Sequence, residues 1–183
     1  DIYYRGLHTI CIKNYILNKS ICLMNPLLQS VQIALQNAKQ KEAIDFINKV
    51  VDFCVEHENG RVLEGWPEDR MQLLIAYHLA KHTFLFEQDE EGNIQGVFMW
   101  YNCNEDDGWP FVQDWEADDP EGNAIFMAFL FAEDTKTFKR LTQNFIIKCP
   151  EVMQKKLLGV RYRNQKPTRV EYTPELFKRI LSI

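Results

Sequence analysis

Two carboxylates in the middle of the chain, Asp114 and Glu116, are candidates for a general base. They flank Trp115 and follow Trp109, and an apolar neighbour raises the pKa of a carboxyl group toward the range useful for proton transfer. A solvated loop carboxylate is the plainer interpretation of each residue. We therefore name Asp114 and Glu116 as catalytic candidates and keep both interpretations.

Two histidines four residues apart, His78 and His82, have a spacing at which one helix could present both to a metal ion. Glu64 or Asp69 would be the nearest further ligand in the sequence. His78 falls on an apolar stripe, however, so a buried, hydrogen-bonded His78 and a His82 at the helix C-terminus explain the pattern without a metal. We expect no metal site. An EF-hand is also not expected, since residues 104–108 lack its alternation of ligands.

The cysteines predict neither a disulfide framework nor a zinc site, because they are odd in number, widely scattered and without C-x-x-C spacing. This usage is typical of a reducing cytoplasm. One of them, Cys103, ends a predicted strand and would be a nucleophile if a histidine lay close to it in space, which the spacing does not indicate. The cysteines are Cys11, Cys22, Cys54, Cys103 and Cys149.

Charge is strongly separated along the chain although its formal net value is only −5. Residues 87–121 are rich in Asp and Glu and contain no Lys or Arg, whereas residues 136–179 are mainly basic. Four of these basic residues alternate along the predicted strands and form a basic ladder. This ladder could bind nucleic acid, with Tyr162 and Tyr172 available for stacking. The pI of about 5.4 argues against nucleic acid as a partner. The ladder would otherwise bind the phosphates of a cofactor or pair with the acidic segment. It consists of Arg161, Arg163, Lys166 and Arg169.

Size and composition predict one globular domain. A chain of 183 residues with 46% hydrophobic residues can bury one substantial core. Its longest apolar run, residues 124–132, is much shorter than the roughly 20 residues that span a bilayer. We expect the domain to occupy residues 24–183. Residues 1–23 are expected to be either a non-native or disordered extension, with Met24 as the true start, or an N-terminal strand or targeting segment.

Helical periodicity dominates the first part of the chain. Apolar residues recur at helical spacing over residues 27–35 and again over 43–55, which predicts two amphipathic helices, with Gly60 as the stop of the second. A third helix is expected from Pro67, followed by acidic residues that suit the positive end of its dipole. Its expected inward stripe is Met71, Leu74, Ile75, His78 and Leu79.

The periodicity changes to that of strands at Thr83. Residues 84–86 and 94–101 form a predicted hairpin that turns at residues 89–93, where Gly92 and Asn93 can supply positive φ. Apolar residues occur at both odd and even positions of the second strand, which point to opposite faces of the sheet. Both faces should therefore be covered. Further strands are expected at 124–132, 157–162 and 168–172, with a helix capped by Thr135 and ended by Pro150, and a short helix opened by Pro174. This order predicts an α/β (α+β) fold with a mixed, mostly antiparallel central sheet and helices on both faces.

The hairpin and the strand–helix junction resemble the GNAT superfamily of N-acetyltransferases, in particular small divergent members such as those encoded by phages. The resemblance covers roughly residues 67–172. It rests on the hairpin segments Phe84–Glu87 and Ile94–Trp100, with Gly96 after the turn, and on strand 124–132 leading directly into a helix. It implies that strand 124–132 splays from its neighbour, which we expect to be strand 94–101.

The resemblance also implies a cofactor site for acetyl-CoA or another acyl-CoA. The backbone of Phe131 and Ala132 would hold the pantetheine arm, and the following helix N-terminus would hold the pyrophosphate, because unpaired N–H groups and the helix dipole favour an anion. The acyl acceptor would be an amine of a small molecule or protein, drawn to the acidic segment. Side chains suited to the phosphates are Thr135, Lys136, Thr137 and Lys139.

One part of the GNAT pattern is absent. The glycine-rich phosphate loop, Q/R-x-x-G-x-G/A, is replaced by Phe-Ala-Glu-Asp-Thr-Lys at residues 131–136, and Glu133 and Asp134 would repel phosphate. Two hypotheses follow. The chain is either a divergent GNAT-like acyltransferase or a catalytically inactive GNAT-like protein with an interaction or virion-associated role.

Overall fold

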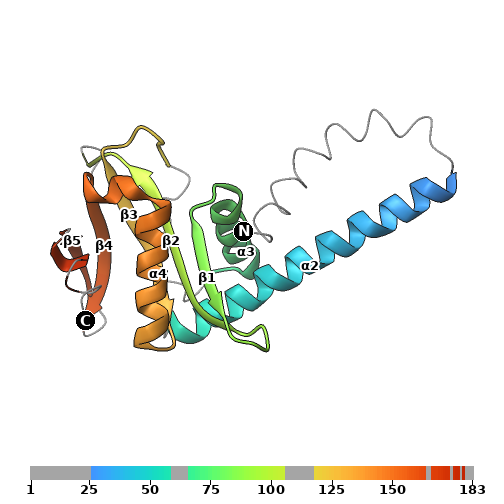
Figure 1. Cartoon of the computed structure of the whole chain (residues 1–183), viewed down its shortest axis with the longest axis horizontal. Helices are drawn as coiled ribbons and strands as arrows, with labels where there is room; N and C mark the ends of the chain where they lie inside the picture. The colour runs from blue at the N-terminus through green and yellow to red at the C-terminus, as the bar shows by residue number, and fades with distance from the viewer. Residues whose placement is uncertain are drawn as a thin grey trace. The chain divides into compact units, whose positions relative to one another are not determined.

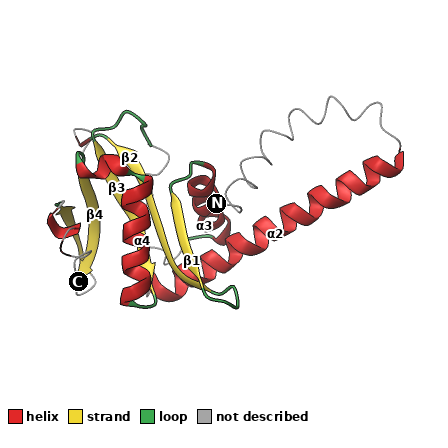
Figure 2. Ribbon diagram, in the orientation of Figure 1, coloured by secondary structure: helices red, strands yellow, loops and turns green. Residues whose placement is uncertain are grey.

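A computed structural model of the chain describes residues 26–58, 66–105, 118–163, 166–173, 175–177 and 179. Figures 1 and 2 show a sheet with helices packed on it. No helix in these ranges combines the length and apolar character needed to cross a bilayer. The elements in order are α2 (Pro26–Glu58), α3 (Glu68–Ala80), β1 (Phe84–Gln88), β2 (Ile94–Cys103), β3 (Ala124–Ala132), α4 (Thr135–Lys148), the 3-10 helix η4 (Pro150–Met153), β4 (Lys156–Arg163) and β5 (Lys166–Tyr172).

The five strands lie in the order β1-β2-β3-β4-β5, which makes β3 the central strand. Only β3 and β4 run parallel, whereas β1 with β2, β2 with β3, and β4 with β5 are antiparallel. A parallel pair needs a crossover connection, and α4 with η4 provides it. The predicted mixed, mostly antiparallel sheet is therefore confirmed.

The predicted hairpin is also confirmed, and its turn has a clear physical basis. Gly92 has φ +82°, a left-handed conformation that glycine adopts without steric strain. The Asp89 carboxylate accepts hydrogen bonds from the backbone N–H of Asn93 at 2.7 Å and from its side-chain amide at 2.9 Å. These bonds hold the pKa of Asp89 below its ordinary value and fix the register of β1 on β2.

Helices cover both faces of the sheet, as the apolar character of β2 predicts. On one face, Phe98 and Trp100 of β2 pack against Leu141 and Phe145 of α4, which lies in front of the sheet in Figure 1. On the other face, Met99 lines a small apolar space together with side chains of α3 and of the last turns of α2. The alternation of side chains along a strand separates these two sets.

The expectation of two N-terminal helices is wrong, because residues 26–58 form the single helix α2. Residues 36–42, between the two apolar stretches, contain no glycine or proline and include Ala, Lys, Gln and Glu, which favour helix. The chain divides into two compact units, Asp1–Asn48 and Lys49–Ile183, so α2 contributes to both. Everything described below belongs to the second unit. The expected stop at Gly60 and the expected helix start at Pro174 lie outside the described residues.

Two further expectations require correction. Asp134, rather than Thr135, caps α4, because its carboxylate accepts a hydrogen bond from the backbone N–H of Thr137 at 2.6 Å. Strands β2 and β3 do not splay. They are paired from Gly96 opposite Ala132 to Cys103 opposite Ala124, with one irregularity near Trp100, so their backbone groups satisfy each other.

Candidate functional site

The sheet opens between β3 and β4. Their parallel pairing begins at Ala124 opposite Lys156 and ends at Met127 opposite Gly159, although β3 continues to Ala132 and β4 to Arg163. Beyond Met127, the backbone groups of β3 that point away from β2 therefore have no ladder partner on β4. Such groups in an extended strand are ready to bind another extended chain.

A pocket of about 600 Å³ lies at this end of β3. Leu130 and Ala132 face the α4 side of the sheet, since they pack against the core that contains Leu141. Phe131 faces the opposite side by strand alternation, and the other edge of β3 is covered by β2. The pocket therefore lies at the free edge and end of β3. Its lining residues are His57, Leu130, Phe131, Ala132, Glu133, Asp134, Thr135 and Phe138.

His57, in the last turn of α2, is held in the pocket wall by both ring nitrogens. Nδ1 lies 2.8 Å from the backbone oxygen of Phe53, one helical turn earlier, and the ring stacks on the Phe53 ring with centroids 4.1 Å apart. Nε2 lies 3.2 Å from Oε1 of Glu133. Both oxygens can only accept hydrogen bonds, so each contact is a hydrogen bond only where the ring nitrogen carries a hydrogen.

The N-terminus of α4 is already occupied by a carboxylate. Asp134 accepts the Thr137 N–H, and this hydrogen bond is the main reason that the pKa of Asp134 lies below its ordinary value. A capping carboxylate also offsets the positive end of the helix dipole. A phosphate at this helix N-terminus could therefore not bind the Thr137 N–H, and the Asp134 carboxylate would repel it.

Two cations, Arg161 and Lys166, lie on β4 and on the neighbouring strand β5, on the far side of the opening from β3. Arg161 is two residues beyond Gly159, so it shares the face of Leu157, which belongs to the core under α4. Lys166 lies on the same face of β5 as Tyr172, which packs against that core. Both cations are exposed. Because β3 and β4 are parallel, these residues lie at the same end of the sheet as the start of α4.

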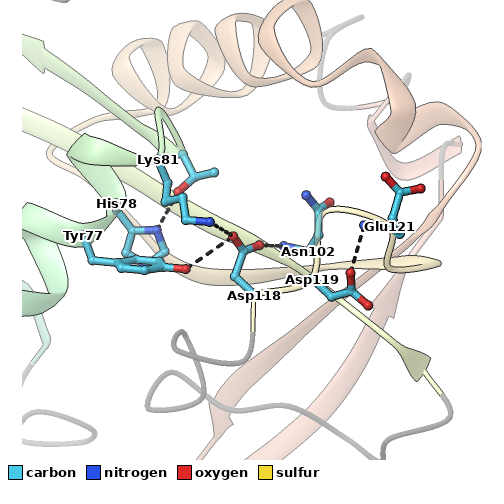
Figure 3. Close-up of polar contacts among 8 residues, drawn as sticks. Tyr77, His78, Lys81, Asn102, Asp118, Asp119 and Glu121 are labelled. Carbon is cyan, nitrogen blue, oxygen red and sulfur yellow. Dashed lines mark hydrogen bonds and ion pairs between the residues drawn. The ribbon is translucent and has the colours of Figure 1, made fainter. Parts of the chain in front are cut away.

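A second polar cluster lies at the opposite end of β3, around Asp118 (Figure 3). The Asp118 carboxylate accepts hydrogen bonds from the backbone N–H of Asn102 at 2.9 Å and the Tyr77 hydroxyl at 3.3 Å, and it pairs with the Lys81 ammonium at 3.2 Å. Its side chain is only 6% exposed. Desolvation, followed by the Asp118 charge, raises the pKa of Tyr77, and the hydrogen bond with Asp118 raises that of Lys81.

This cluster has a structural role that its geometry explains. Asp118 and Asp119 lie at the end of the segment that precedes β3, and the backbone N–H of Asp119 donates to the backbone oxygen of Asn102 at 3.1 Å. Asp118 thus attaches this segment to β2 and to α3 through Tyr77 and Lys81. No pocket adjoins the cluster among the best-formed pockets of the described chain.

The structure brings together only part of the predicted cofactor set. Phe131, Ala132 and Thr135 line the pocket. Lys136 is exposed in the first turn of α4 and Lys139 is half-buried, but neither lines the pocket. Thr137 is a buried residue of α4, and its hydroxyl accepts a hydrogen bond from Arg140 at 3.3 Å. The catalytic candidates Asp114 and Glu116 lie outside the described residues, so their role stays a prediction.

The alternative chemistries weighed above find no geometric support in the described ranges. No group of three or more His, Cys, Asp or Glu residues there could hold a metal ion. His78 is fully buried and lies 2.8 Å from the Thr83 hydroxyl through Nδ1, as its place on the apolar stripe predicts. Cys54, Cys103 and Cys149 are buried, and none of them is in a disulfide bond.

Sequence reasoning missed His57 and Glu133 as a pair. Their separation along the chain gives no periodic signal, and Glu133 attracts attention only as the residue that replaces a phosphate-loop position. The histidine in the last turn of α2 was the available signal, because a ring at a helix C-terminus can bond a carbonyl one turn earlier. Comparison with known proteins adds no assignment, since neither a family model nor a curated protein sequence matches this chain.

Proposed function

We propose that the chain is a divergent GNAT-like acyltransferase that binds an acyl-CoA along the free edge of β3 and transfers the acyl group to an amine. One observation carries the proposal. The parallel pairing of β3 and β4 ends at Met127 and Gly159 while both strands continue, and a pocket opens at the end of β3. The resemblance to the GNAT superfamily implies an opening of this kind beside strand 124–132.

The free edge suits the pantetheine arm of such a cofactor. An extended strand exposes alternating N–H and C=O groups, and the amides of pantetheine can pair with them as another strand would. The side chains beside this edge are apolar at Leu130, Phe131 and Ala132, which favours burial of the methylene groups between the amides. Phe131 and Ala132 are the residues proposed to bind the arm.

The phosphates require positive charge that the capped helix does not supply. Arg161 lies on β4, the other strand of the opening, and Lys166 lies at the start of β5, the next strand; both are exposed at the end of the sheet where α4 begins. Thr135, Lys136 and Lys139 add polar and basic groups to the first turns of α4. We propose that these side chains take the place of the absent glycine-rich loop, with Arg161 and Lys166 as the main contacts.

The alternative function is that of a non-catalytic interaction protein that keeps the fold without the cofactor. A specific observation favours it, because Asp134 occupies the α4 amide that a phosphate would use and Glu133 adds a second carboxylate beside it. In that case the pocket would not bind an acyl-CoA and would be part of the surface of a non-catalytic interaction protein.

Calorimetric titration with acetyl-CoA separates the two functions. We expect binding, and a rise in unfolding free energy of about 2.7 kcal/mol at a ligand concentration a hundredfold above Kd. The double substitution Arg161→Gln and Lys166→Gln should weaken binding by about tenfold, through loss of two charge-assisted contacts. The double substitution Lys39→Gln and Lys41→Gln removes two exposed charges on α2 and should leave affinity unchanged.

The absence of heat and of any stabilisation at millimolar acetyl-CoA would contradict the acyltransferase proposal and favour the interaction protein. Equal weakening by the two double substitutions would show that only overall charge matters and would exclude Arg161 and Lys166 from the site.

A further inference from the structure

The opening between β3 and β4 has an outer end, at Ala132, and an inner end, where the two strands join. The last parallel pair at the inner end is Met127 opposite Gly159. One pair further in, Phe126 lies opposite Leu158, and these side chains are 0% and 1% exposed. A molecule that follows the free edge of β3 inward therefore stops at Met127 and Gly159.

The face of the sheet opposite α4 is closed at the inner end. Leu157 belongs to the core under α4, so its neighbour Leu158 points to the opposite face, and so does Phe126, its partner in the ladder. Both are buried. Only the α4 face then offers a way out of the sheet at this point.

Tyr172 of β5 covers the inner end on the α4 face. Gly159 has no side chain, and a Cβ atom there would lie 2.9 Å from Cε2 of the Tyr172 ring and 3.4 Å from Cε of Met127. Both side chains thus reach the space above Gly159, which a larger residue would fill. Both pack against the core under α4 and are only partly buried.

We propose that Tyr172 determines the length of the acyl chain that the site accepts. An acyl-CoA whose pantetheine arm follows β3 places its thioester at the inner end, beside Met127 and Gly159. The Tyr172 ring leaves room there for an acetyl group, whereas a long acyl chain would have to displace the ring. The inference rests on the proposed function, because it specifies the substrate of the same site.

The length of the free edge agrees with this placement. Residues 128–132 of β3 lie beyond the ladder with β4 and span about 16 Å at about 3.3 Å per residue. The pantetheine arm joins its phosphate oxygen to its sulfur through about twelve bonds, which cover about 14 Å because an extended chain covers about 3.5 Å for every three bonds. With the phosphates at the outer end, the sulfur reaches the inner end.

Calorimetric titrations of the full chain with acetyl-CoA and hexanoyl-CoA test the length limit through the ratio of their dissociation constants. In the wild type, hexanoyl-CoA should bind about tenfold more weakly than acetyl-CoA, because it overpacks the inner end. Tyr172→Ala opens the α4 face above Gly159. It should make the two constants equal or favour hexanoyl-CoA, whose added methylene groups then pack on Met127.

Two control variants separate the bulk of the ring from other effects. Tyr172→Phe keeps the ring without the hydroxyl group and should keep the wild-type ratio. Thr168→Ala shortens an exposed side chain on the same face of β5 and should also keep it.

Met127→Ala tests the same space from the other strand. It enlarges the space above Gly159 and should move the ratio in the same direction as Tyr172→Ala. Partial unfolding of either variant cannot imitate this result, because loss of folded protein weakens the apparent binding of both thioesters equally. A wild-type ratio in Met127→Ala would contradict the space above Gly159 as the limit.

The outcomes distinguish the length limit from the acyl-CoA site itself. Equal affinity of the wild type for the two thioesters, or a wild-type ratio in Tyr172→Ala, would overturn the role of Tyr172 and leave the acyl-CoA site standing. Absence of binding by acetyl-CoA, hexanoyl-CoA and free CoA would reject the proposed function and the length limit together.

Discussion

At the scale of single residues, His78 shows how burial decides the chemistry of a histidine. Its side chain is fully buried on α3, and desolvation lowers its pKa to about 4, although Asp118 and the backbone of Trp100 act in the opposite direction. Thr83 binds Nδ1, and Nε2 has no hydrogen-bond partner among the described residues. The ring is therefore a neutral core group at physiological pH.

The low pKa of His78 predicts acid sensitivity. The unfolded chain binds the proton near pH 6.5 and the folded chain only near pH 4, so stability is fully present above about 6.5 and is lost as pH falls toward 4. The loss attributable to His78 should be about 3 kcal/mol. Urea unfolding at pH 4 and 7.5 should show that difference between the wild type and a His78→Leu, Thr83→Val protein. Identical pH dependence in both proteins would exclude His78 as its source.

At the scale of elements, Gly96 allows α4 to approach β2 closely. A Cβ atom at this position would lie 2.8 Å from Leu141 Cδ1, 2.8 Å from Thr137 Cγ2 and 3.0 Å from the backbone oxygen of Phe131. These residues belong to α4 and β3, so the added methyl group would push α4 away from the sheet beside the pocket. A small residue is needed there for packing, since φ at Gly96 is not in the left-handed region.

Gly96→Ala should destabilise the protein by roughly 1–3 kcal/mol, as overpacking in a well-packed core does. Denaturant unfolding measures the change. Gly92→Asn is the control at the hairpin, because asparagine tolerates the positive φ of that turn and nothing lies within 4 Å of the added Cβ. Losses of the same size at both positions would indicate a general effect of replacing glycine instead of contact with α4.

The same elements explain what sequence reasoning could predict. The hairpin, α3, β3, β4 and β5 have local signals, such as the glycine turn at Gly92 and the apolar run of β3, that agree with the final packing. The cap of α4 was mispredicted because Asp134 and Thr135 are both good caps, and only the backbone conformation selects Asp134. The opening of the sheet was assigned to the wrong pair of strands, because register between distant strands depends on tertiary packing.

At the scale of the whole molecule, the candidate site combines segments that sequence patterns do not connect. His57 comes from the end of α2, Glu133 from the β3–α4 junction, and Arg161 from a strand that follows the crossover helix. Charge patterning indicated basic groups near residue 161, but not their place opposite β3. Parallel pairing of β3 with β4 brings these groups to one end of the sheet, and that pairing becomes visible only in the folded chain.

The distribution of the core predicts which part of the chain is needed for folding. Every buried hydrophobic residue among those described lies at or after Val50, within the unit Lys49–Ile183. Removal of residues 1–42 keeps the last turns of α2, including His57 and Phe53, and should therefore preserve one cooperative thermal transition. Circular dichroism would follow the transition, and acetyl-CoA titration would follow the pocket. A broad transition, or a midpoint lowered by more than about 10 °C, corresponding to roughly 2–4 kcal/mol at this size, would show that the first unit contributes to the stability of the second.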